Sequence, residues 1–204
     1  MLFLTILFSI TPAKAALSSF VVPGSGDILM GEKKRGACFM AAEATIWLTY
    51  FYKNNEANKI NSRSKNFASF YASANSSIDD EDYFRAMEDF MTNIDYNETI
   101  KEEARRLYPD TLNVEIMQER IELRKAYIDT TSYMGSDSWN WQSSELADNY
   151  RNMRRDRRST LQTATNMVGL AVTNRVISFF TTYFFGKRIT VEVKQNEVEM
   201  GFRF

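Results

Sequence analysis

The 204-residue chain contains no histidine and a single cysteine, Cys38. Without histidine it lacks the commonest general base and metal ligand of enzymes, and no Ser-His or Cys-His nucleophile pair can form. A single thiol excludes an internal disulfide, so packing or a membrane must hold the fold. The carboxylates are not spaced so as to face one another across a substrate. We therefore expect no enzymatic activity, no catalytic residue, no metal and no cofactor.

The chain also has little net charge and few residues that break helices. Lys and Arg number 25 against 26 Asp and Glu, whereas nucleic-acid binding needs a basic face that neutralises phosphates. We therefore expect no nucleic-acid partner. Only three Pro and eight Gly interrupt the sequence, and this scarcity favours helices.

The first fifteen residues resemble a secretory leader in pattern. An apolar run of about ten residues is followed by Ala13-Lys14-Ala15, which fits a small-x-small cleavage site. The pattern predicts a leader over 1–15 and a single mature domain over 16–204. No Lys or Arg precedes the apolar run, so a retained first helix or membrane anchor stays the alternative. The run is shorter than the roughly 20 residues that span a bilayer.

Residues 16–52 form a predicted apolar hairpin. Pro23 and Gly24, followed by Gly26, mark a turn between two apolar elements. Residues 37–52 then favour a helix in which Glu43 is the one charge. Sixteen residues rise about 24 Å, less than a hydrocarbon core of about 30 Å. This helix fits a short transmembrane span, a half-inserted hairpin arm or a buried core helix.

A helical middle section is predicted over 53–142. Its polar start, 53–66, has the composition of a loop, and Thr99 with Glu102 forms a capping box that predicts a helix start. Trp139 and Trp141 lie on the same side of a turn near its end. They suit either a packed corner or an aromatic belt at a membrane interface.

A long helix is predicted over 143–188, apolar from 161 to 185 except for Asn174, Arg175 and a few Thr. An unpaired charge is costly in lipid or in a core, so Glu43 is expected to meet Arg175 or Asn174 where the two apolar helices pack. Alternatively each charge faces water separately. The basic segment 154–158 suits an anionic-lipid contact or a solvated helix face.

The last segment, 189–204, alternates apolar and polar residues and ends in Phe204. This alternation predicts a β-hairpin. The last strand of an outer-membrane barrel ends in the same way. An alternative function is therefore an outer-membrane assembly component that donates this hairpin to a partner's sheet.

Six segments of the chain carry recognisable motifs: 23–26, 31–36 with Glu43, 104–109, 137–141, 150–154 and 174–178. Together they resemble an uncharacterised family of exported bacterial cell-envelope proteins, a domain of unknown function. The resemblance covers nearly the whole mature chain, although the usual Gln after the Pro-Gly-x-Gly motif is Asp27 here. It implies export and membrane association, and it carries no activity.

The sequence thus predicts a mainly α fold: an apolar helical hairpin packed on a long C-terminal helix, a helical middle section and a small C-terminal β-hairpin. The expected function is non-enzymatic. It is that of a membrane-associated protein of the bacterial cell envelope with a structural or partner-binding role, its partners being membrane lipid and another envelope protein. The candidates for structural or interaction roles are Pro23, Gly24, Gly26, Glu43, Trp139, Trp141, Asn174, Arg175 and Phe204.

Overall fold

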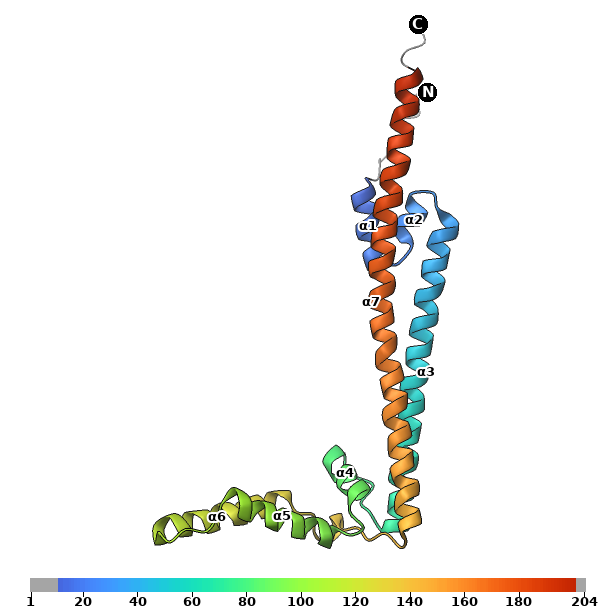
Figure 1. Cartoon of the computed structure of the whole chain (residues 1–204). Coiled ribbons are helices and arrows are strands. Elements are labelled where there is room, and N and C mark those ends of the chain that lie inside the picture. Colours follow the sequence, from blue (N-terminus) through green and yellow to red (C-terminus); the bar gives the residue numbers. More distant parts are fainter. Residues whose placement is uncertain (1–10, 201–204) are drawn as a thin grey trace, which may run out of the picture. The chain divides into compact units, whose positions relative to one another are not determined.

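The chain folds almost entirely into helices (Figure 1). The computed structural model describes residues 11–200, with side chains up to Gly186. By contacts it divides into two compact units, unit 1 (Met1–Asn55 and Leu161–Phe204) and unit 2 (Glu56–Thr160), and α3 and α7 contribute to both. The elements are α1 (Pro12–Val21), α2 (Ser25–Leu29), α3 (Lys33–Ala72), α4 (Glu81–Asp89), α5 (Asn93–Leu107), α6 (Val114–Thr131), the 3-10 turn η1 (Gly135–Asp137) and α7 (Ser144–Met200).

The predicted C-terminal β-hairpin over 189–204 is wrong. Within residues 11–200 no β-strand forms, and α7 continues to Met200. The long helix, expected to end at residue 188, continues beyond it, and Gly186 lies inside it, where an added Cβ would be 3.1 Å from Pro12 Cβ. Its small size therefore serves packing. A helix satisfies its own backbone, whereas two isolated strands are marginal. Phe204 lies outside the described residues, and hairpin donation to a partner sheet loses its basis.

The loop expected over 53–66 is also wrong, because α3 runs unbroken from Lys33 to Ala72. The polar composition concealed small residues at helical spacing, Ala57, Ser64, Ala68 and Ala72, all of which are buried. The polar residues between them mostly face solvent. The boundary expected at residue 53 therefore falls within a helix.

The helix start predicted at Thr99 is wrong by two turns. α5 begins at Asn93, and its N-cap is Thr92, whose Oγ1 accepts a hydrogen bond from the Asp95 backbone N–H at 3.1 Å. Thr99 lies inside α5 and donates its hydroxyl to the Asp95 carbonyl oxygen. Two capping patterns occur seven residues apart, and the structure uses the first.

Unit 2 has a core of buried aromatic residues into which both tryptophans are packed. Trp139 donates its indole N–H to the Phe90 carbonyl at 3.1 Å, and Trp141 donates to the Met87 carbonyl at 3.0 Å. Both indoles are at most 3% exposed. Because buried indole groups need an acceptor, these bonds fix the corner between α4 and α7. Of the two alternatives for these tryptophans, the structure therefore shows the packed corner and not an aromatic belt at a membrane interface.

The basic segment 154–158 is largely neutralised inside unit 2. Arg154 is fully buried and forms ion pairs with Glu81 and, at 3.3 Å, with Glu88. Arg158 lies 2.7 Å from Glu88, and Arg157 lies 2.9 Å from Glu81. The hydrogen bond to Glu88 raises the pKa of Arg158. Because most of its cations are paired with carboxylates of unit 2, this segment has little unpaired positive charge with which to bind anionic lipid.

The buried pair between Arg154 and Glu88 gives a stability prediction. Replacing Arg154 by Gln should lower the free energy of unfolding by at least about 2 kcal/mol, since a buried carboxylate loses one of its cations. Urea unfolding of the full chain measures this. Arg155 is exposed, and Arg155→Gln should stay within about 0.5 kcal/mol of the original chain. Equal losses for both variants would contradict the assignment.

Candidate functional site

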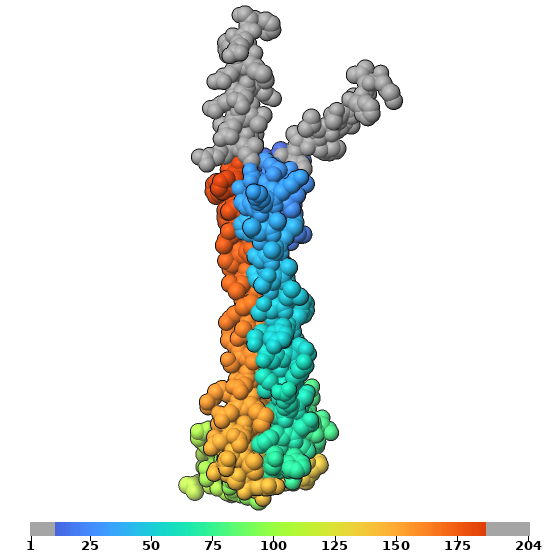
Figure 2. Space-filling view, turned by 90° about the vertical axis from the view of Figure 1, so that its right-hand side faces the viewer, coloured from blue at the N-terminus to red at the C-terminus, as the bar shows by residue number. Residues whose placement is uncertain are grey.

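The interior of unit 1 consists of small and polar residues. There α1 and α2 pack against residues 178–186 of α7, which Figure 2 shows as blue atoms against red. A chain of hydrogen bonds runs through fully buried groups. The Gly26 backbone N–H donates to Ser19 Oγ at 2.9 Å, Ser19 lies 2.9 Å from Thr182 Oγ1, and Thr182 donates to Asp27 Oδ1 at 3.0 Å. In addition, Ser178 Oγ accepts the Gly24 N–H at 2.8 Å. These bonds tie α1 and α2 to α7.

Asp27 is the buried charge of this network, and sequence reasoning missed it. Arg35 contacts its Oδ1 through Nε at 3.0 Å and Nη2 at 2.8 Å. The Arg35 guanidinium also lies 4.5 Å above the ring of Phe185. Asp27 Oδ2 has no hydrogen-bond partner among the described residues. The available signal was a carboxylate within an otherwise apolar segment, eight residues before an arginine.

The glycines of the predicted turn bring backbones into contact. Gly24 has a φ of +83°, and a Cβ there would overlap the carbonyl oxygen of Gly36. A Cβ at Gly26 would overlap the carbonyl oxygen of Ala15. The segment expected as a cleavage site, 13–15, thus forms part of α1 and packs on α2. The leader itself stays a prediction.

Glu43 and Arg175 form the expected pair, with 2.8 Å between Glu43 Oε1 and Arg175 Nη2. Asn174 donates its amide to Glu43 Oε2 at 3.0 Å. Trp47, one turn along α3, donates its indole N–H to Oε1 at 2.9 Å, a contact that the spacing of four residues could have indicated. The carboxylate is therefore held by three donors from two helices.

The exterior of unit 1 is formed by large apolar side chains. Small or polar groups inside and large apolar groups outside reverse the usual order for a domain in water. Helices that pack within lipid use this arrangement, with small residues at close contacts and polar groups joining the helices. The apolar side chains of unit 1 that are at least half exposed are Leu17, Phe20, Val21, Val22, Leu29, Leu48, Phe51, Tyr52, Val172, Phe180 and Phe184.

In the part of the chain that the structure describes, no helix combines the length and the apolar composition that crossing a bilayer requires.

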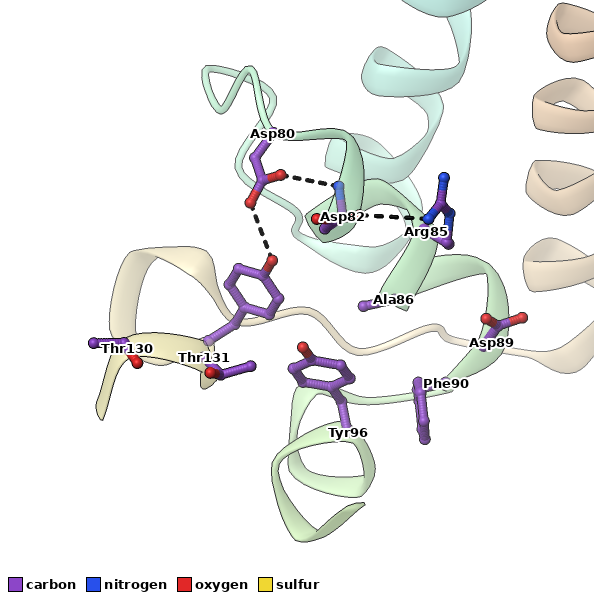
Figure 3. A pocket seen from close by; sticks show the side chains of 10 residues that line it. Asp80, Asp82, Arg85, Ala86, Asp89, Phe90, Tyr96, Thr130 and Thr131 are labelled. Atoms are coloured by element: carbon purple, nitrogen blue, oxygen red, sulfur yellow. Dashed lines mark hydrogen bonds and ion pairs between the residues drawn. The ribbon is translucent and has the colours of Figure 1, made fainter. Parts of the chain in front are cut away.

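Unit 2 carries an open pocket of about 460 Å³ (Figure 3). Two of its carboxylates already have partners within the protein. Asp80 accepts hydrogen bonds from the Tyr133 hydroxyl at 3.1 Å and from the Asp82 backbone N–H at 2.9 Å, and the Asp82 carboxylate forms an ion pair with Arg85. Burial raises the pKa of Tyr133, and the Asp80 charge raises it further. The pocket is lined by Asp80, Asp82, Arg85, Ala86, Asp89, Phe90, Tyr96, Thr130, Thr131 and Tyr133.

The polar residues of this pocket hold the fold together. Asp80 caps α4, and the Tyr133 hydroxyl stays a protonated donor that joins the end of α6 to that cap. Within the described residues no group of three His, Cys, Asp or Glu side chains is placed to hold a metal ion. The pocket therefore gives no basis for assigning a nucleophile, a general base or a cofactor.

The glycine contacts generate a second prediction. Gly24→Ala and Gly26→Ala should each destabilise unit 1 by about 1–3 kcal/mol, because an added methyl group must displace backbone. Gly24→Ala also strains a left-handed conformation. Thermal unfolding and protease resistance of the full chain measure this.

The matched control is Gly169→Ala in α7, where an added Cβ meets nothing within 4 Å. Replacing a glycine inside a helix by alanine should leave stability unchanged or raise it by up to about 1 kcal/mol. Destabilisation by this control as large as that at Gly24 would refute the close-contact explanation.

The Glu43–Arg175 pair is tested by a double-mutant cycle. Glu43→Gln, Arg175→Gln and the double variant should show a coupling of about 1 kcal/mol, moderated by water because the Arg175 side chain is 35% exposed. The exposed pair Glu98–Lys101, treated in the same way, should couple more weakly. Strict additivity at Glu43 and Arg175 would mean that the pair contributes nothing.

Comparison with known proteins adds no further assignment. No model of a protein family matches the chain, and neither a curated protein nor a solved structure shows significant similarity to it. The resemblance to envelope proteins stays a prediction, and the site described above is the basis for function.

Proposed function

We propose that the chain is a non-enzymatic, membrane-associated protein of the bacterial cell envelope in which unit 1 carries the contact with lipid. The observation that supports this most is the inverted arrangement of unit 1. Serine, threonine, alanine, glycine and one aspartate lie inside, and leucine, valine and phenylalanine lie outside.

The energetic argument rests on the exposed side chains. Burying a large apolar side chain completely is worth about 1.5–3 kcal/mol, so a half-exposed one leaves roughly 1 kcal/mol unrealised. Eleven such side chains represent an amount comparable to the whole stability of a small domain. Exposed apolar surface of this amount is typical of a membrane or protein contact.

Lipid fits this surface better than a single protein partner. Consecutive residues of a helix point about 100° apart, so a partner that covers one stripe leaves the neighbouring residue uncovered. In α7 both Val176 and Ile177 are exposed, as are both Phe184 and Phe185. Apolar exposure around so much of the helix suits a solvent of acyl chains, which surrounds a helix on all sides.

The path of α1 and α2 suits entry and return on one side of the lipid. Pro12, at the start of α1, and Met30, just after α2, both lie next to Gly186. The tip at Gly24 contacts Ser178, eight residues or about 12 Å earlier in α7. Non-helical backbone at membrane depth is tolerated only where protein buries and satisfies it. Ser178 and Ser19 supply the acceptors for the tip, so the turn meets this condition.

A partner-binding role is supported by a different surface, in unit 2. Helix α6 packs along α5 but has no buried residue. Its side chains Val114, Ile116, Ile121 and Leu123 are all exposed. A helix with this exposed apolar surface is suited to bind a further envelope protein while unit 1 is held by lipid.

The lipid contact is tested with site-specific labels, because Cys38 is the only cysteine and is exposed. In a Cys38→Ser background, Leu48→Cys and Phe180→Cys carry a polarity-sensitive fluorophore on unit 1, and Ser136→Cys carries it on unit 2. Addition of phospholipid vesicles should shift emission to shorter wavelengths at both unit 1 positions, and nitroxide-labelled acyl chains should quench it. Ser136→Cys should show neither effect.

The negative outcomes are equally defined. A chain that stays in the aqueous fraction after vesicle flotation, with unshifted labels at positions 48 and 180, would overturn the proposal. Release of the chain from native envelopes by carbonate alone would exclude integral insertion.

A further inference from the structure

Charge is unevenly divided between the two units. Unit 1 holds ten Lys and Arg against six Asp and Glu, whereas unit 2 holds fifteen against twenty. The near-neutral total therefore conceals a basic unit with an apolar exterior and an acidic unit with an aromatic core. A basic, apolar surface is attracted to a negatively charged bilayer, and an acidic one is repelled by it.

The cations of unit 1 differ in how far they are already paired. Arg35 is bound to Asp27, and Arg175 is bound to Glu43. In contrast, Lys14, Lys33 and Lys34 are exposed, and none of their ammonium groups forms an ion pair with a described side chain. We call these three lysines the basic end.

The basic end lies where α1, α2 and α3 come together. Lys14 is in the first turn of α1, and Lys33 opens α3 three residues after Met30. Because Pro12 and Met30 both lie beside Gly186, the beginnings of α1 and α3 belong to the same end of unit 1 (Figure 1). Glu32 is the one exposed carboxylate in the described chain near them.

Large apolar side chains adjoin these lysines. Leu17 follows Lys14 by one turn, and Leu29 precedes Lys33 by four residues; both are more than half exposed. Lysine commonly lays its apolar stem along such a surface and keeps its ammonium at the level of the lipid headgroups. The ammonium is also a flexible point charge that suits a phosphate.

We infer that the basic end binds the phosphate groups of anionic phospholipids, so that unit 1 selects negatively charged bilayers. This inference rests on the proposed function, because it needs unit 1 at the lipid surface. Its assignment of Lys14 applies to the chain in which the first helix is retained. To the proposed function it adds the class of lipid that unit 1 binds and the residues that recognise it. It also assigns this role to Lys14, Lys33 and Lys34, rather than to the basic segment 154–158.

The test compares partitioning of the full chain into two kinds of vesicle, phosphatidylcholine alone and phosphatidylcholine mixed with phosphatidylglycerol. The original chain should partition more strongly into the mixed vesicles. Each juxtamembrane lysine contributes about fivefold. The triple variant Lys14→Gln, Lys33→Gln, Lys34→Gln should therefore lose on the order of a hundredfold of that preference. High salt should reduce the preference of the original chain in the same direction.

The matched control removes three exposed cations from unit 2, Lys59→Gln, Lys125→Gln and Arg155→Gln, and changes the net charge by the same amount. It should keep the preference for phosphatidylglycerol. An equal loss in this control would overturn the inference, because the effect would then belong to net charge rather than to the basic end.

The failure of the inference is distinguishable from that of the proposed function. Equal partitioning of the original chain into both kinds of vesicle would overturn the selection of anionic lipid while leaving lipid contact intact. Partitioning into neither would overturn both. Retained preference in the triple variant would leave lipid contact standing and remove the assigned role of the three lysines.

Discussion

The close approach of backbones at Gly24 and Gly26 is the constraint on which unit 1 depends. Because glycine has no Cβ, the turn after α1 can lie against the start of α3, and α2 can lie against α1. Neither position leaves room for a side chain. Only at this distance can short hydroxyl groups such as Ser19 and Ser178 accept the backbone N–H groups of the turn. A side chain in place of either glycine would separate the hydrogen-bonding partners as well as the helices.

The same close packing explains why the apolar side chains of unit 1 face outward. A seam of glycine, alanine and hydroxyl groups has no volume for leucine or phenylalanine, so Phe20 and Phe180 must lie on the other side of their helices. In unit 2 the opposite holds. Trp139 and Trp141 fill the interior, and the charged Arg154 is accepted there only because two carboxylates compensate it. One chain thus uses two packing regimes.

How far the sequence predicts this structure depends on the range of the interaction. Glu43 and Arg175 could be paired in advance, because each is a conspicuous charge in an apolar helix and burial makes pairing necessary. The continuation of α7 could not, because alternation over 189–193 fits a strand as well as a helix, and Gly186 fits both a helix end and a packing contact. Asp27 was missed for a related reason: its importance comes from Thr182 and Arg35, which only the folded chain brings to it.

The placement of charge then follows from the packing. A cation buried within unit 2 needs a carboxylate, so Arg154 and Arg157 of the segment 154–158 pair with Glu81 in the first turn of α4. These paired charges attract a distant surface less than unpaired charges would. The interior of unit 1 instead holds one carboxylate with one arginine, and Lys14, Lys33 and Lys34 are exposed. The run of arginines in unit 2 is therefore weaker evidence for lipid binding than the three lysines of the basic end. What matters is whether a carboxylate in the fold already pairs with the cation. Here carboxylates pair with Arg154, Arg157 and Arg158, whereas the ammonium groups of Lys14, Lys33 and Lys34 are available to phosphate.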